Sequence, residues 1–221
     1  MAPIEIYGMQ GSAPCRILEM TAECLGLEYE FKVVDLAKGD NRKPEYLAMN
    51  PMHTIPTLKD GDFICPESRA AAAYLVNKYG KNDGLYPRDV EVRARVDQRL
   101  YFDMGVFYQA FGDLAYPIMF ETGKTPGQDK VDKFKEVMGW MNDFVAGDKF
   151  AAGTNQMTLA DISLLASYST IRAAGGIGGV DVSTYPKIEA WYKKCIKLVP
   201  NYEKANGEGA TEFGEYYKAK C

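Results

Sequence analysis

The chain has 221 residues, of which 47 % are apolar and 25 % charged, and a formal net charge of −4. This composition is typical of an ordinary globular protein, and the negative net charge argues against nucleic acid or an anionic membrane surface as a partner. The sequence lacks an apolar run of about eighteen residues and an N-terminal signal pattern, so we expect no membrane partner and a cytoplasmic location.

The first eighty residues alternate strand and helix patterns. Ile4, Ile6 and Tyr7 predict a first strand, and a helix follows that starts near Pro14 and ends at Gly26. Further elements are expected as a strand over 28–33, a short helix over 43–47, a hairpin with strands 57–59 and 63–65 around a turn at 60–61, and a helix over 67–79. This order predicts a thioredoxin-like α/β domain over residues 1–80, with a small mixed sheet between helices.

Strand patterns stop after residue 80. Residues 81–89 predict a linker, because Asn, Asp, Gly and Pro cluster there. A long helix is expected from residue 92 until Pro117 ends it, with further helices over 129–145, 158–171 and from 186. Thr158 and Asp161 have the spacing of a capping box for a buried central helix. Residues 90–221 are therefore expected to form an all-α domain.

Ser12 lies at the predicted junction between the first strand and the first helix. Free backbone amides and the helix dipole favour an anion at such a junction. Ser12 and Cys15 have the spacing of a thioredoxin-type Cys-x-x-Cys in which a hydroxyl replaces the first thiol. A hydroxyl cannot exchange disulfides, but it can hold the thiolate of another molecule. Tyr7 and Cys15 are rival candidates, although a strand tyrosine is usually core and an early helical cysteine usually buried and inert.

The segment from His53 to Pro56 precedes the first hairpin strand. A proline at this point of such a fold favours a cis Ile55–Pro56 bond, which would expose the backbone of Ile55 as an edge for an extended peptide. His53 by itself is more often structural than functional.

Glu67, Ser68 and Arg69 open the last helix of the first half, and two interpretations are evenly balanced. The acidic residue either complements the helix dipole, or it binds an ammonium group while Ser68 and the free amides bind a carboxylate. An α-amino acid presents those two groups together.

Two further features have a simple interpretation as structure. An aromatic set lines one side of the long helix, where core packing is the default expectation: Tyr108, Phe111, Tyr116 and Phe120. Five scattered cysteines and the single His53 have no metal-ligand spacing, so no metal site is expected.

Five segments taken together resemble the cytosolic glutathione S-transferases of the arthropod delta/epsilon type over essentially the whole chain. They are residues 11–16, 50–58, 67–70, 98–104 and 159–161. The resemblance implies a homodimer in which a thioredoxin-like glutathione-binding domain adjoins a helical domain. It implies conjugation of the glutathione thiolate to a small apolar electrophile, with peroxide reduction as a side activity. Glutathione would be a co-substrate, without a tightly bound cofactor, and the region 101–103 would lie at the dimer interface.

The resemblance also implies roles for the motif residues. Ser12 would donate its hydroxyl to the glutathione sulfur. The other glutathione contacts would be His53 at the glycine end, Thr54, Ile55 and Pro56 at the cysteinyl residue, and Glu67, Ser68 and Arg69 at the γ-glutamyl head. Tyr108, Phe111, Tyr116 and Phe120 would line the electrophile pocket, and Asp161 would be a structural cap.

Some positions depart from the family pattern, and other functions stay open. Asn41 stands where a second histidine is frequent, Pro66 where a tryptophan is common, and Gln10 where a proline is frequent. The first alternative function is a non-catalytic ligand-binding or structural relative. The second is a disulfide or dehydroascorbate reductase, which would require cysteine in place of Ser12.

Overall fold

The computed structural model describes residues 3–120 and 125–221. Its sheet contains β1 (Ile4–Gly8), β2 (Tyr29–Val33), β3 (Thr57–Asp60) and β4 (Phe63–Pro66) in the order β2-β1-β3-β4. β1 runs parallel to β2 and antiparallel to β3, and β3 pairs antiparallel with β4. The predicted mixed sheet is confirmed.

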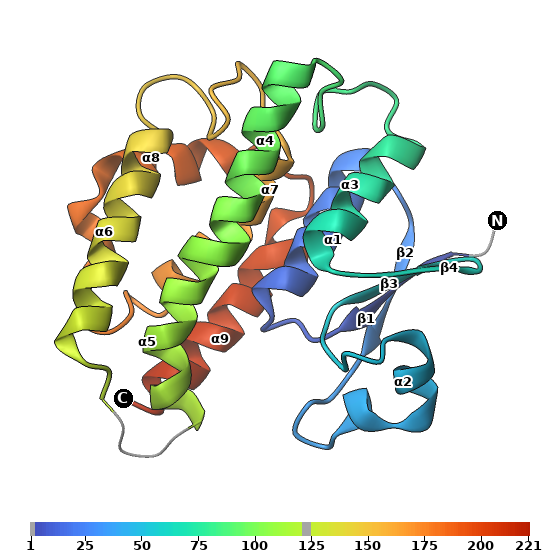
Figure 1. Ribbon diagram of the computed structural model, residues 1–221, viewed down its shortest axis with the longest axis horizontal. Coiled ribbons are helices and arrows are strands. Elements are labelled where there is room, and N and C mark those ends of the chain that lie inside the picture. The colour runs from blue at the N-terminus through green and yellow to red at the C-terminus, as the bar shows by residue number, and fades with distance from the viewer. Residues whose placement is uncertain (1–2, 121–124) are drawn as a thin grey trace.

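The first helices surround this sheet. α1 (Ala13–Leu25) and α3 (Ser68–Tyr79) pack together on the side that faces the rest of the protein, whereas α2 (Pro44–Met49) lies on the other side, after the short turn η1 (Asp40–Arg42) (Figure 1). α1 starts and ends as predicted, with Ser12 at the N-cap, Pro14 in the first turn and Gly26 in the left-handed region at φ 65°.

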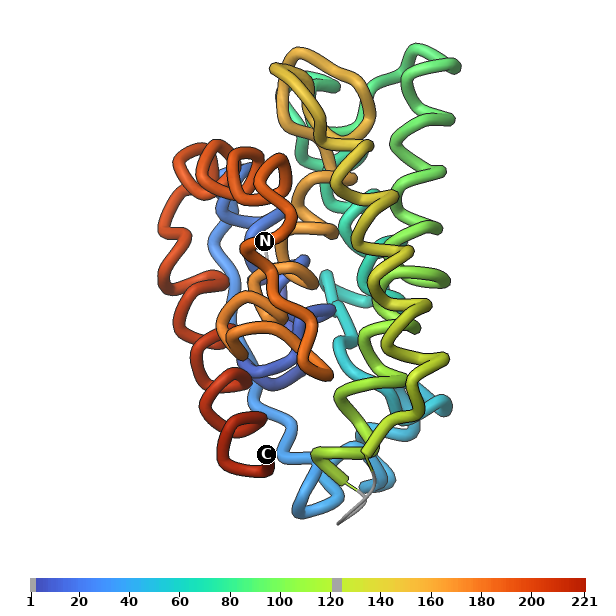
Figure 2. The backbone as a smooth tube through the Cα atoms, turned by 90° about the vertical axis from the view of Figure 1, so that its left-hand side faces the viewer, coloured from blue at the N-terminus to red at the C-terminus, as the bar shows by residue number. Residues whose placement is uncertain are grey.

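The second half of the chain is helical in the described residues. It contains α4 (Val90–Phe102), the π-helical turn η2 (Asp103–Phe107), α5 (Tyr108–Phe120), α6 (Gln128–Phe144), α7 (Leu159–Ala173), the short turn η3 (Val182–Thr184), α8 (Pro186–Cys195), the π-helical turn η4 (Glu203–Gly207) and α9 (Glu208–Lys218). Figure 2 shows α5 and α6 side by side on one flank and the C-terminal helix on the other. A thioredoxin-like sheet domain followed by a helical domain is therefore the architecture of the chain.

Helix α7 is the centre of the molecule. Every residue from Leu159 to Ile171 is buried, and α7 contacts both α1 and α3. Asp161 accepts hydrogen bonds from the Thr158 amide (2.9 Å) and from the amide of Ala151 (2.8 Å). The prediction of a capped, buried helix is confirmed, and one continuous apolar core joins the sheet domain to the helices.

Two local predictions are wrong. Pro117 does not end its helix, because α5 continues to Phe120. A proline so close to a helix end forfeits only one late hydrogen bond, which the helix tolerates. The hairpin loop comprises residues 61–62 and not 60–61, since Asp60 pairs with Phe63 and Gly61 takes the positive φ of 61°.

None of the described helices is long and apolar enough to cross a membrane.

Candidate active site

Ser12 occupies the N-cap of α1, one residue before the helix begins. Its backbone is extended (φ −81°, ψ 115°), and its carbonyl accepts the amides of Cys15 (3.1 Å) and Arg16 (3.2 Å). The Ser12 side chain is half-buried and caps none of the helix amides. Pro14 has no N–H, so the groups of this turn that can serve an anionic ligand are the Ser12 hydroxyl and the Ala13 amide.

Tyr7 and Cys15, the two rival candidates, are both engaged in other contacts. The Tyr7 hydroxyl donates to the Glu5 carboxylate, and burial together with this bond raises the pKa of Tyr7 to about 12. Cys15 is fully buried against Gly8, where an added Cβ would collide with the sulfur, and burial raises the pKa of its thiol to about 11. Neither group is set up to activate an external thiol at neutral pH.

The loop before β3 has the predicted cis Ile55–Pro56 bond. Asn50, which is fully buried, donates to the Thr54 carbonyl (2.9 Å), and the Tyr46 hydroxyl donates to the same oxygen (2.6 Å). Within residues 3–120 and 125–221 the backbone of Ile55 has no hydrogen-bond partner. Tyr46 and Asn50 thus fix a loop whose free backbone edge can pair with a peptide.

His53 lies next to Asn41 in this loop. The Asn41 side-chain amide donates to the His53 carbonyl (2.7 Å), and His53 has a positive φ of 48°. Asn41, which departs from the family pattern, therefore contacts the backbone of His53, the residue predicted to bind the glycine end of glutathione.

The start of α3 combines backbone strain with a buried hydroxyl. Glu67 is the N-cap at φ 68° and ψ 95°, a conformation that costs a residue with a side chain about 1–3 kcal/mol. Its side chain is exposed, whereas Ser68 beside it is buried. The amides of this turn can bind a carboxylate and the Glu67 side chain can bind an ammonium group, the two charges of an amino acid head group.

Arg69 points into the protein toward the helical domain. Its guanidinium binds the fully buried Asp103 carboxylate of η2 (2.5 Å) and the Ser68 hydroxyl (3.2 Å). Ser163 of α7 also donates to Asp103. Sequence reasoning missed Asp103 as a support of this turn and placed its region at a dimer interface. That expectation is wrong for Asp103, which is fully buried, although Tyr101 is 69 % exposed.

The predicted aromatic set forms a continuous row along α5. Ring centroids are 5.4 Å apart for Tyr108 and Phe111, 6.0 Å for Phe111 and Tyr116, and 5.8 Å for Tyr116 and Phe120. Phe111 is buried, whereas Tyr116 and Phe120 are exposed. Phe213 of α9 extends the row, with its ring centroid 5.6 Å from that of Phe111. The sequence shows aromatic residues in this tail but not that they reach α5.

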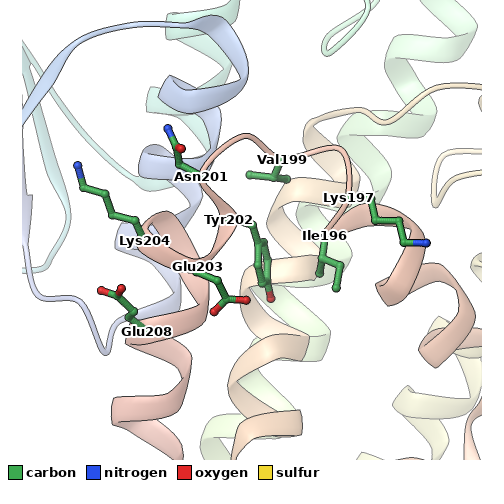
Figure 3. A pocket seen from close by; sticks show the side chains of 8 residues that line it. All are labelled: Ile196, Lys197, Val199, Asn201, Tyr202, Glu203, Lys204 and Glu208. Atoms are coloured by element: carbon green, nitrogen blue, oxygen red, sulfur yellow. The ribbon is translucent and has the colours of Figure 1, made fainter.

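A separate hollow of about 580 Å³ lies at the corner between α8 and α9. Its lining contains both lysines and acids around Tyr202, and Lys204 and Lys197 lie at its two ends in the view of Figure 3. It includes none of the predicted site residues. In the described ranges, no group of three or more acidic, histidine or cysteine side chains could hold a metal ion.

Comparison with known proteins agrees with this geometry. Residues 6–83 match the family described as "Glutathione S-transferase, N-terminal domain". The chain is 42 % identical over 204 residues to Glutathione S-transferase D7 of Drosophila melanogaster, covering 92 % of this chain and 88 % of that protein.

Solved structures are similar over nearly the whole chain. A delta-class glutathione transferase of Nilaparvata lugens superposes with a TM-score of 0.93 at 42 % identity, covering 99 % of this chain and 100 % of the other. A glutathione transferase homologue of Drosophila mojavensis, solved with bound glutathione, gives 0.90 at 38 % identity, covering 100 % and 98 %.

The fold defines a protein with a thioredoxin-like sheet domain and a helical domain. The chain belongs to the glutathione S-transferase family, and its structural neighbours are insect enzymes of the delta and epsilon classes.

Proposed function

We propose that this glutathione transferase uses the Ser12 hydroxyl to keep the sulfur of glutathione ionised, and that the thiolate then attacks a small apolar electrophile. The observation that carries the proposal is a half-buried hydroxyl at the start of α1 that caps no helix amide. A hydroxyl donor beside the start of a helix is what a developing sulfur anion requires.

The interactions available at Ser12 are strong enough to lower the pKa of a bound thiol. A free thiol has a pKa of about 8.5, and lowering it by about 2 units requires about 2.7 kcal/mol. A hydrogen bond to a charged acceptor contributes about 1.5–3 kcal/mol, and a helix N-terminus about 0.3–1 kcal/mol more. Ser12 and its helix can therefore supply the shift together, and orientation beside the electrophile accounts for the remaining acceleration.

The rest of glutathione would extend from Ser12 along the two other turns. The free backbone of Ile55, beside Thr54 and Pro56, pairs with the cysteinyl residue, and His53 meets the glycine carboxylate. Glu67 binds the γ-glutamyl ammonium while Ser68 and the amides of α3 bind its carboxylate. Arg69 contributes by fixing this turn to Asp103.

The electrophile pocket would lie along the aromatic row. Tyr108, Tyr116 and Phe120 present ring surface, Phe111 supports them from the core, and Phe213 adds a wall from α9. Glutathione acts as co-substrate in this scheme, which uses no tightly bound cofactor and allows peroxide reduction as a side activity. We further propose a cytoplasmic homodimer with domains over 1–80 and 90–221 joined by residues 81–89.

Replacement of the hydroxyl tests this function. Ser12→Ala should retain binding to immobilised glutathione but lower kcat/KM for an aryl halide about 30-fold to 100-fold at pH 6.5, since roughly 2–3 kcal/mol of anion stabilisation is lost. Tyr7→Phe is the matched control and should change the rate less than threefold. Equal losses of kcat/KM in both variants would mean that Ser12 is not the residue that activates the thiol.

A further inference from the structure

Arg16 is a buried cation one helical turn after Ser12. The residue is fully buried, and its guanidinium donates to the Asn206 carbonyl oxygen (3.2 Å), to the Asn206 side-chain oxygen (2.6 Å) and to the Thr170 hydroxyl (2.5 Å). Arg16 thus connects the start of α1 with α7 and η4. The active-site proposal gives it no role.

All three of these acceptors are neutral, which is unusual for a buried charge. In the part of the chain that the structure describes, no Asp or Glu forms an ion pair with Arg16, and its Nε atom is buried without a partner. Arg69, the comparable arginine of α3, is neutralised by Asp103. Burial lowers the pKa of Arg16 to about 10, so the guanidinium remains charged at neutral pH. A buried charge without a counter-ion is costly, and this one lies one helical turn from Ser12.

The guanidinium and the Ser12 loop are held against the same point of α9. A Cβ placed on Gly209 would collide with the Gln10 carbonyl and lie 2.9 Å from Arg16 Cδ. Gly209 is buried, so its missing side chain is what lets both groups approach. Gly209 therefore packs against both the loop that carries Ser12 and the aliphatic part of the Arg16 side chain.

The other charged and titratable groups around Arg16 do not cancel its charge. Those that face it or the adjoining loop are Cys15 and Glu19 of α1, Arg69 of α3, Tyr108 of α5, Tyr202 before η4 and Glu212 of α9. Burial raises the pKa of both the Tyr108 phenol and the Cys15 thiol, so neither group carries a charge at pH 7. Burial raises the pKa of Glu19 to about 7, so this acid carries only part of its charge, and Glu212 is exposed to solvent.

We propose that Arg16 supplies a fixed positive field at the Ser12 end of α1 that stabilises the glutathione thiolate, and that Asn206 holds the guanidinium in place without neutralising it. This inference rests on the proposed function and extends it. Arg16 does not touch the sulfur. It places a positive charge near the Ser12 hydroxyl, which is the group that contacts the sulfur.

The expected size follows from Coulomb's law. Four residues of helix span about 6 Å, and a unit charge at roughly 10 Å in a medium of effective dielectric constant about 20 shifts a pKa by about one unit. The field would thus add to the contribution of Ser12 without replacing it.

Asn206→Asp is the sharpest test, because it keeps the shape of the clamp and adds a negative charge. The Asn206 amide of the wild-type protein donates to Ser169 and Tyr202 (both 2.9 Å). The Tyr202 hydroxyl can turn to donate to a carboxylate, whereas Ser169 would first have to release the Leu165 carbonyl (2.6 Å). We expect the thiol of bound glutathione, titrated by its ultraviolet absorbance, to gain about one pKa unit. kcat/KM should fall about tenfold below that pKa and recover at high pH. An unchanged thiol pKa, or a loss of equal size at every pH, would overturn the proposal.

A second pair of variants keeps the test decisive if Asn206→Asp does not fold. Arg16→Lys preserves the charge and should leave the thiol pKa within about 0.3 units, whereas Arg16→Gln should raise it by about one unit. Equal pKa values in the two variants would contradict a role of the charge. If wild-type protein itself fails to lower the pKa of glutathione, the proposed function fails, which is a different result.

Discussion

Positive backbone φ angles occur in three non-glycine residues of the described chain, and two of them are predicted glutathione contacts. His53 and Glu67 lie at φ 48° and 68°, while Asn201 is at the corner before η4. Each such conformation costs about 1–3 kcal/mol and persists where the surroundings impose it, often at functional sites. The sequence indicates the importance of both turns, but not their strain, because His and Glu adopt a positive φ only occasionally.

Glu19 is a buried acid whose ionisation should affect stability. It is 1 % exposed, and its Oε2 atom accepts from Gln10 (3.1 Å), while its other oxygen is buried without a partner. Burial raises the pKa of Glu19 from its ordinary 4.5 to about 7. Between these values the folded protein binds the proton more tightly than the unfolded chain, so the free energy of unfolding falls as the pH rises.

Glu19→Gln should remove this pH dependence. The variant keeps the volume of the side chain without its charge, so we expect it to raise the free energy of unfolding by about 1–3 kcal/mol at pH 8 and to change it little at pH 5. Urea denaturation at the two pH values measures the difference. An identical effect at both would mean that the carboxyl is not protonated in the folded state.

At the scale of elements, α7 depends on the cap at its first turn. The Asp161 carboxylate is fully buried and also accepts from the Trp191 indole (2.9 Å), besides the amides of Thr158 and Ala151. Its removal would leave several buried donors unpaired in the centre of the molecule, each at a cost of about 1–3 kcal/mol.

Asp161→Ala should therefore lower the free energy of unfolding by about 3–5 kcal/mol. Asp129→Ala is the matched control, because Asp129 is an exposed acid in the first turn of α6, and it should cost less than about 1 kcal/mol. Chemical denaturation of both variants decides the point. Similar losses would mean that the Asp161 network contributes no more than a dipole interaction.

Sequence patterns predicted most elements because they are local. The apolar run of α7 and its capping box, the glycine after α1 and the alternation in β2 each specify an element from a few neighbouring residues. The π-helical turns at 103–107 and 203–207 were not predicted, since they depend on distant partners: Arg69 binds Asp103, and Arg16 binds Asn206. For the same reason, the local sequence identifies Ser12 as a site residue but does not show that Gly209, almost 200 positions later, contacts the loop of Ser12.

At the scale of the whole molecule, the sheet domain and the helices share one core. α1 and α3 pack on α7 (Figure 1). The Arg69–Asp103 ion pair connects α3 with η2. Neither half can separate without exposing apolar surface and a buried charge. We expect one transition in scanning calorimetry, with Asp103→Asn lowering its midpoint. Two resolved transitions would show that the halves unfold independently.

The pKa of the glutathione thiol in the complex measures the central claim most directly. In the wild-type protein the thiolate absorbance should titrate about 2 units below the value of free glutathione, because the Ser12 hydroxyl and the start of α1 favour the anion. With Ser12→Ala bound to glutathione, most of that difference should disappear. A thiol that titrates at the same lowered pH without the hydroxyl would contradict the account.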